Sequence, residues 1–384
     1  MNHERLIKRS TIIERRLSGN IFSTIAIDKD ENIIGCGCSK LYSFAQKGYV
    51  SLSAGTVDIM AVSNSGSREY KSLTPFDYEL MPYCVFEYGS GIHMSGYNVK
   101  SVTYENMVIA TVYLDGTVSV GGICEADEDD ASYWTDIDDI VIFDGGVLGV
   151  TKAGNIKLCG AGARPYLEMS AWNNIALVKQ IHDGIVGFAY DGFVGLKKDG
   201  TLLYCGKDRA FAEHIATYQD VVSFDGYSSN GKIHEFYAIL SDGSMQWYHL
   251  GDNMIPSFDK KSHKKDYLAV KYLPSGAHFI KYDGTIETHS QKITYPNGIK
   301  DALLTLTGKK YGVVSEAMNN AENTPLAEQV STWKLFDDPD EVLRRYEGFE
   351  SKSFKNNKKC LYCGGELKGI LGKKCTVCGK KSSY

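Results

Sequence analysis

Short apolar segments occur in pairs along most of the chain, and each pair is joined by a polar turn. In FVGLKKDGTLLYCG (193–206), for example, two alternating runs flank Asp-Gly. Alternation with a period of two is typical of β-strands, and Asp-Gly favours a tight hairpin because the turn needs positive φ. The chain is therefore expected to be all-β. The pairs occupy residues 23–37, 109–122, 147–160, 193–206, 236–251 and, in weaker form, 278–290.

The turn glycines recur at a nearly constant distance. Gly116, Gly154, Gly200, Gly243 and Gly284 are 38, 46, 43 and 41 residues apart, which is the length of one four-stranded propeller blade. Two degenerate turns precede them, at Asn32 and Gly66, and an incomplete unit follows at 311–320. These seven turns together predict a seven-bladed β-propeller, although six or eight blades fit the same spacing.

The repeat resembles that of the regulator of chromosome condensation family. The shared pattern is a strand, a D-G-x-hydrophobic turn and a second strand ending in x-Gly, as in VGLKKDGTLLYCGKD (194–208), and it extends over about residues 20–336. The resemblance implies a propeller built from such repeats. Where the family usually carries Trp-Gly, this chain has Cys36, Cys159 and Cys205 before glycine. Their equivalent positions in the repeat indicate small buried core residues.

A short helix and a polar linker are expected after the propeller. Asp338 can cap the helix, Pro339 suits its first position, and Gly348 can end it. We therefore divide the chain into a propeller (1–336), a helix and linker (337–358) and a small C-terminal domain (359–384).

The C-terminal domain is predicted to be a zinc ribbon. Two C-x-x-C pairs, each followed by glycine, are separated by eleven residues. Zn²⁺ prefers four thiolates in a tetrahedron, and the glycines permit a tight turn beneath the sulfurs. Four cysteines leave no open coordination position, so the expected metal is one structural Zn²⁺. The segment resembles the zinc ribbons found in many bacterial proteins. Its predicted ligands are Cys360, Cys363, Cys375 and Cys378.

An acidic segment at 125–139 is a candidate interaction loop. It holds eight carboxylates but lacks the glycine and the spacing of a helix-loop-helix calcium site. It is either a solvated loop or a docking surface for a basic partner, including the chain's own tail. The candidate residues are Asp127, Glu128, Asp129, Asp130 and Trp134, which either anchors a partner or belongs to the core.

Charge is unevenly distributed between the body and the tail. Residues 351–384 carry nine Lys and one acidic residue, so they sum to +8, whereas residues 1–350 sum to −13. The tail contains no Arg and has Tyr362 and Tyr384 near the cysteines. Base readout usually draws on Arg and stacking on aromatics, but lysines can contact phosphates. Nucleic-acid binding through the tail is therefore kept as an alternative function.

The function expected first is that of a protein-interaction scaffold. The nine His are dispersed, and the sequence has no compact catalytic motif, so an enzyme is not expected. Residues 1–19 contain no continuous apolar run of the kind that export signals carry, and no segment is long and apolar enough to span a bilayer. Ten Cys without an export signal favour reduced thiols and a cytoplasmic protein. The expected partners of the scaffold are proteins.

Overall fold

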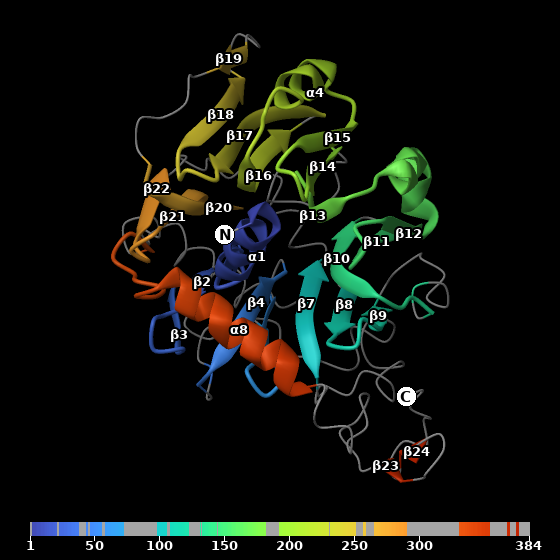
Figure 1. The fold of residues 1–384 in the computed structure, drawn as a ribbon, viewed down its shortest axis with the longest axis vertical. Helices are drawn as coiled ribbons and strands as arrows, with labels where there is room; N and C mark the ends of the chain where they lie inside the picture. The colour runs from blue at the N-terminus through green and yellow to red at the C-terminus, as the bar shows by residue number, and fades with distance from the viewer. Residues whose placement is uncertain are drawn as a thin grey trace, which may run out of the picture.

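Antiparallel sheets surround a central helix in the computed structural model (Figure 1). In the part of the chain that the structure describes, six of these sheets have three strands and one has four. At most junctions the first strands of neighbouring sheets contact one another, and the last sheet contacts the first. Within the described residues, this arrangement is that of a β-propeller with seven blades. The structure describes residues 2–20, 23–37, 44, 47–55, 58–72, 98–105, 108–122, 131, 133–143, 145–181, 192–229, 231–250, 256–258, 265–289, 330–353, 367–368 and 374–375.

Each blade is built from strands that are consecutive in the sequence. The strands of blades one to four are β1 Leu17–Asn20, β2 Ser23–Ile27, β3 Ile33–Gly37, β4 Tyr49–Ala54, β5 Asp58–Ser63, β6 Arg68–Ser72, β7 Val99–Glu105, β8 Val108–Tyr113, β9 Val118–Gly122, β10 Ile137–Phe143, β11 Gly146–Thr151 and β12 Ile156–Cys159. The strands of blades five to seven are β13 Ile175–Gln180, β14 Gly192–Lys197, β15 Leu202–Gly206, β16 Val221–Ser229, β17 Lys232–Leu240, β18 Met245–Leu250, β19 Pro256–Phe258, β20 Tyr267–Leu273, β21 Gly276–Lys281 and β22 Ile286–His289.

Helices lie at the axis, across one face and at the outer edge of this ring (Figure 1). None of the described helices is both long enough and apolar enough to cross a membrane. A two-stranded antiparallel pair, β23 with β24, lies in the C-terminal segment. The helices and this pair are α1 His3–Glu14, the 3-10 helix η1 Ala161–Ala171, α4 Arg209–Ile215, α8 Pro339–Ser353, β23 Leu367–Lys368 and β24 Lys374–Cys375.

The start of α8 agrees with the sequence. The helix begins at Pro339, and the Asp338 carboxylate accepts a hydrogen bond from the Asp340 amide at 2.9 Å, as an N-cap does. The predicted end at Gly348 is wrong, because the helix continues to Ser353. Leu343, Tyr346 and Phe349 form one buried row on α8, so packing outweighs the low helix propensity of a single glycine.

The turn glycines join each blade to the next. The carbonyl of each turn glycine accepts a hydrogen bond from the first residue of the following blade. The donor–acceptor pairs are Val99–Gly66 (3.2 Å), Ile137–Gly116 (2.9 Å), Ile175–Gly154 (2.9 Å), Val221–Gly200 (3.0 Å) and Tyr267–Gly243 (3.1 Å). The predicted turns are thus both hairpin tips and contact points between blades.

The first repeat differs by one residue from the prediction. The sequence suggested Asn32 as its turn residue, but Glu31 adopts the left-handed conformation, with φ 62°. The Glu31 amide donates to the Asp28 carbonyl, as the Gly116 amide donates to Tyr113. The left-handed conformation costs a non-glycine residue about 1 kcal/mol. Without a glycine, the sequence of this turn does not indicate which residue adopts it. The incomplete unit at 311–320 lies outside the described residues.

The ring is closed by two segments that are distant in sequence and share the position of one strand. In blade four, the Lys152 amide donates to the Asp136 carbonyl, one residue before β10. In blade one, the equivalent amide of Lys29 donates to Lys334, at 3.2 Å, although Lys334 is distant in sequence. The neighbouring Leu335 amide donates to the Gly284 carbonyl at 2.9 Å. Residues 334–336 therefore supply the outer half of the first strand of blade one, and β1 supplies the rest.

A buried histidine lies where blade seven meets blade one. His278 is fully buried, and its Nε2 is 2.8 Å from the Ser275 hydroxyl, which is 3.3 Å from that of Thr24. Its Nδ1 has no hydrogen-bond partner among the described residues. Burial lowers the pKa of His278 to about 4 from the ordinary 6.5. The folded protein thus holds His278 neutral at pH values where the unfolded chain would protonate it.

Acidification should therefore destabilise the propeller through His278. Between pH 6.5 and 4 the unfolded state binds a proton that the folded state does not, so this contribution to stability is present above pH 6.5 and is lost as the pH falls. Urea unfolding at pH 7 and pH 4.5 should show a loss about 2 kcal/mol larger in the wild type than in His278→Asn. Equal losses in both proteins would contradict this assignment.

Candidate functional site

The N-terminal helix α1 occupies the axis of the propeller. It contacts the first strands of blades one, five, six and seven, and α8 packs against it (Figure 1). Asn2 caps the helix by accepting a hydrogen bond from the Arg5 amide at 3.0 Å. Ile7, Ile12 and Ile13 are buried. The chain's own helix therefore runs along the axis of this ring.

An ionic network surrounds the end of α1. Glu14, which is 3% exposed, accepts hydrogen bonds from the Ser223 hydroxyl and from Lys179, whose Nζ is 2.6 Å away. Lys179 Nζ also lies 3.5 Å from the Asp225 carboxylate. The Ser223 oxygen in turn accepts from the Val270 amide at 3.0 Å. Side chains and backbone from α1, β13, β16 and β20 are thus joined at the axis.

The network fixes the charge of Lys179. Burial alone would lower the pKa of Lys179, but Asp225 and Glu14 together raise it above its ordinary value, so the ammonium group stays charged. Burial raises the pKa of Glu14, against the opposing effect of Lys179. Burial, reinforced by Lys179, lowers the pKa of Lys271. One charged lysine thus holds two carboxylates together in the middle of the ring.

A charged cleft of about 220 Å³ lies beside α1, and we call it the axial cleft. Its cations are paired: Arg15 with Asp139 at 2.7 Å, and Lys100 with Asp138 and with Glu350 at 3.5 Å. Carboxylates therefore compensate most of its positive charge. The cleft is lined by Glu4, Ile7, Lys8, Thr11, Ile12, Arg15, Lys100, Asp138, Asp139, Thr151, Lys152, Ile175, Ala176, Lys198, Tyr346 and Glu350.

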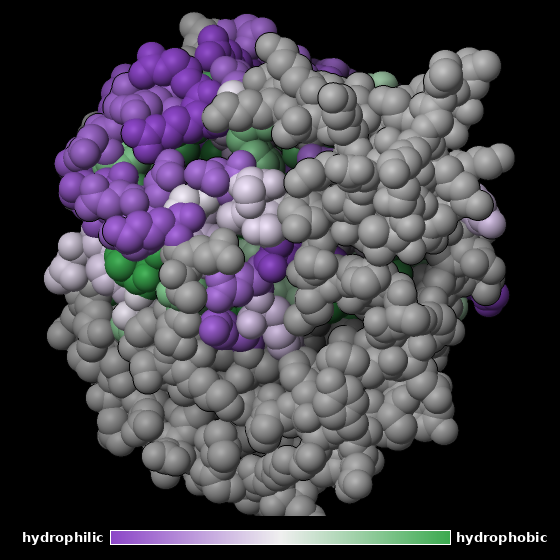
Figure 2. Space-filling model, turned by 90° about the horizontal axis from the view of Figure 1, so that it is seen from below, coloured by the Kyte–Doolittle hydropathy of each residue, from purple (hydrophilic) through white to green (hydrophobic). Residues whose placement is uncertain are grey.

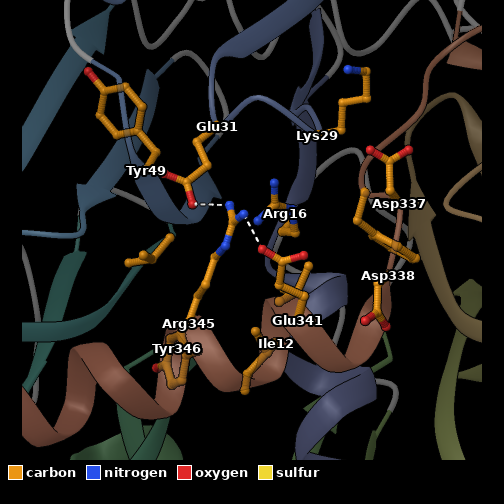
Figure 3. A pocket seen from close by; sticks show the side chains of 13 residues that line it. Ile12, Arg16, Lys29, Glu31, Tyr49, Asp337, Asp338, Glu341, Arg345 and Tyr346 are labelled. Carbon is orange, nitrogen blue, oxygen red and sulfur yellow. Dashed lines mark hydrogen bonds and ion pairs between the residues drawn. The ribbon is translucent and has the colours of Figure 1, made fainter.

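A second cleft of about 70 Å³, the seam cleft, lies where the chain closes the ring (Figure 3). Arg345 of α8 reaches across it to Glu31 at 3.0 Å and also pairs with Glu341. The side chain of Arg16 lies beside that of Arg345 in this view. The cleft is lined by Ile12, Arg16, Lys29, Glu31, Tyr49, Val50, Phe336, Asp337, Asp338, Glu341, Val342, Arg345 and Tyr346.

Trp134 is a core residue. It is 9% exposed and packs in the cluster shared by blades three and four, and a Cβ on Gly149 would lie 2.8 Å from its ring. Trp172 packs over Gly195 in the same way, so the two tryptophans occupy equivalent repeat positions. Each of these tryptophans stands two residues before a residue in the left-handed conformation, Asp136 or Asn174. This spacing is a second repeat signal, which the hairpin pattern alone does not reveal. The acidic residues 127–130 lie outside the described residues.

The cysteines of the propeller behave as the repeat predicts. Cys36, Cys159 and Cys205 are buried, at 3%, 7% and 3% exposure. Burial raises the pKa of the Cys36 thiol to about 11 and that of Cys205 to about 12, so both stay protonated. Within the described residues, no group of three or more His, Cys, Asp or Glu could hold a metal ion. Of the predicted zinc ligands, Cys375 ends β24, and Cys360, Cys363 and Cys378 lie outside the described residues.

The surface offers few large apolar side chains for docking. Among the described residues, the exposed ones are Tyr133 (78%), which precedes β10, and Leu167 (59%), which lies in η1 after β12. Both belong to segments that flank blade four in sequence. Seen from below the view of Figure 1, the described surface is mainly hydrophilic, with small apolar areas (Figure 2).

Comparison with known proteins finds weak similarities to solved structures. No family model and no curated protein sequence matches the chain. Among solved structures, Prp20p from Saccharomyces cerevisiae, described with its binding to Gsp1p and histones, is 10% identical, with a TM-score of 0.38 over 72% of this chain and 84% of that one. Human WBSCR16 is 10% identical, with a TM-score of 0.40 over 65% and 83%. The WD40 propeller of Doa1 is 11% identical, with a TM-score of 0.36 over 69% and 88%.

These TM-scores lie below 0.5, so the similarities do not indicate a shared function. The propeller architecture stands on the pairing of the strands and on the hydrogen bonds that close the ring.

Proposed function

We propose that this chain is a cytoplasmic protein-interaction scaffold. The observation that carries the proposal is the position of α1 in the axis. Propellers often place ligand or substrate sites in the central channel, and here the chain's own helix and its buried ion pairs occupy that space. The faces and the rim then remain for binding. This role rests on architecture, and the partner is proposed to be a protein.

The rim around blade four is the part of the described surface best suited to a partner. Tyr133 and Leu167, which flank blade four in sequence, expose apolar area, and the acidic segment that includes Asp127–Asp130 precedes Tyr133 in sequence. Exposed aromatic and aliphatic side chains beside charged residues are typical of interface centres with polar rims.

Affinity capture with the full chain, followed by binding measurements with the purified partner, tests this function. Replacing both Tyr133 and Leu167 with Ser should weaken binding at least tenfold, because hot spots of this kind contribute more than about 1.4 kcal/mol. Lys265→Ser, at a 63% exposed position on blade seven, is the control and should change binding less than twofold. Equal affinities for all three proteins would contradict a partner site on this rim.

The alternative function is nucleic-acid binding by the lysine-rich tail. It predicts binding to DNA or RNA that falls steeply with salt and disappears when residues 354–384 are removed. Protein capture that survives this truncation, without nucleic-acid binding by the full chain, favours the scaffold.

We further propose that residues 359–384 form a zinc ribbon. The β23–β24 hairpin supports it, because it pairs Leu367 with Cys375 and so connects the two C-x-x-C pairs. Four thiolates on two such turns would hold one Zn²⁺ in a closed, structural site.

Metal analysis of the purified chain should therefore find one zinc per molecule. Cys375→Ser should lose most of this metal, because three ligands bind Zn²⁺ far more weakly than four and the hairpin then loses its cross-link. Cys205→Ser is the matched control: Cys205 is buried in the propeller, so this variant should keep the full zinc content. Zinc well below one per chain in the wild type would contradict the ribbon.

A further inference from the structure

The outermost strand of blade four, β12, has an open edge within the described residues (Figure 1). Propeller blades usually have four strands, but the described sheet of blade four ends at β12. Residues 160–174, which connect β12 to β13, are described throughout and contain η1 and no strand. The connection to the next blade therefore does not supply a fourth strand.

Blade six shows how this fold fills the same position. Its third strand, β18, pairs with β19, and Tyr248 lies opposite Phe258 and Leu250 opposite Pro256. The outer edge of a third strand can thus hold an extended segment, here one of three residues. In blade four, no strand of the described chain takes this place.

The pairing of β12 with β11 decides which backbone groups face outward. The Thr151 amide donates to the Asn155 carbonyl at 2.9 Å. Hydrogen-bonded and non-hydrogen-bonded pairs alternate in an antiparallel ladder, so Lys157 also bonds to β11. Ile156 and Leu158 lie at the alternate positions, so their N–H and C=O groups point away from the sheet. No backbone hydrogen bond joins these outward groups to another described residue.

Apolar side chains belong to the segments on both sides of this edge. On the side of blade five, the half-buried Leu158 packs in one cluster with residues of η1, the helix that carries Leu167. On the side of blade three, the Lys157 ammonium donates to the Thr135 carbonyl at 3.4 Å, two residues after Tyr133. The two large exposed apolar residues of the described chain thus lie in segments that contact β12.

We propose that the outer edge of β12 binds an extended segment of a partner protein, which adds the fourth strand to blade four. This inference rests on the proposed scaffold function and specifies how the partner is recognised on the same rim. Backbone hydrogen bonds join the segment to Ile156 and Leu158. Apolar side chains at every second position of the segment lie on the side of η1, beside Leu158.

Random peptides displayed on phage and selected on the full chain provide the probe. The selected sequences should carry apolar residues at every second position, and synthetic copies should bind Leu158→Pro more weakly than the wild type by about tenfold or more. Proline removes the outward N–H and places its ring at the edge, while the hydrogen bonds to β11 remain. Leu158→Val keeps the N–H and is the control, with an affinity within about threefold of the wild type.

Backbone methylation of the peptide gives a second test, which leaves the protein unchanged. Only every second N–H of an added strand faces β12, so peptides methylated at the two alternate sets of nitrogen atoms should differ. One set should abolish binding, and the other should keep it within about threefold of the parent peptide. Equal effects of both sets would overturn the proposal, even if Leu158→Pro does not fold.

Amide hydrogen exchange locates the contact. The Leu158 amide should exchange rapidly in the free chain and become protected when the peptide binds, whereas the Lys157 amide should be protected in both states. A Leu158 amide that is already protected in the free chain would show that another part of the chain or a second copy covers the edge. The proposal would then be wrong.

The variant with Ser at positions 133 and 167 separates this inference from the proposed function. If it binds the purified partner more weakly than the wild type while Leu158→Pro binds normally, the rim site stands and strand addition is wrong. If Leu158→Pro alone binds more weakly, strand addition stands without the two exposed apolar residues. A selection that yields no peptide dependent on Leu158 also overturns the proposal.

Discussion

Replacing Lys179 with Met should lower the free energy of unfolding by about 3–5 kcal/mol, the usual cost of removing one partner from a buried ion pair. The Lys179 side chain is 13% exposed and that of Glu14 is 4% exposed. Methionine fills a similar volume, so the expected loss is electrostatic. Without Lys179, the carboxylates of Glu14 and Asp225 face each other at the axis with no cation between them.

Urea unfolding of the purified variant measures this loss. In the double variant Glu14→Gln, Lys179→Met, the buried carboxylate is gone as well, and part of the stability should return. Lys198→Met is the control, because its pair with Glu4 is exposed, with side-chain exposures of 25% and 56%, and such pairs contribute less than about 1 kcal/mol. Equal losses for Lys179→Met and Lys198→Met would show that the axial network does not hold the ring.

The repeats were predictable because their signal is local. A turn glycine such as Gly116 or Gly200 must adopt positive φ within a few residues of the strands that it joins, so spacing alone gives the blades. The buried cysteines follow for the same reason, since one repeat position carries one environment.

The axial helix could not be predicted in the same way. Residues 3–14 are rich in charge, and nothing local shows that Glu14 will meet Lys179, which is 165 residues away. The split first strand of blade one is equally non-local, since Lys334 replaces a residue that in every other blade directly precedes the strand. Contacts of this range depend on the closed ring, which no single segment encodes.

Trp134 illustrates an intermediate case. Its place beside eight carboxylates left two interpretations open, a partner anchor or a core residue, and it packs on Gly149, in the next hairpin along the chain. Comparison of Trp134 with Trp172 would have indicated a shared repeat position, because each stands two residues before an Asp or Asn that is followed by Ile.

Gly284→Ala should weaken the closure of the ring and lower the free energy of unfolding by about 2–4 kcal/mol. Gly284 has φ +83°, and a Cβ there would lie 2.1 Å from the carbonyl oxygen of Phe336. Backbone strain and overpacking each cost about 1–3 kcal/mol. Because the obstructing atom belongs to the backbone, residues 334–336 must move away from blade seven to accept the methyl group.

Hydrogen exchange locates this effect as well as measuring it. The amides of Lys29 and Leu335 form the closing hydrogen bonds, so both should exchange faster in Gly284→Ala, while the Ile137 amide between blades three and four should not. Gly231→Ala is the matched control: its φ is +73° but a Cβ there meets no atom within 4 Å, so it isolates the cost of conformation, about 1 kcal/mol. If both variants lose the same stability, the methyl group does not disturb the seam, and closure does not depend on the contact between Gly284 and Phe336.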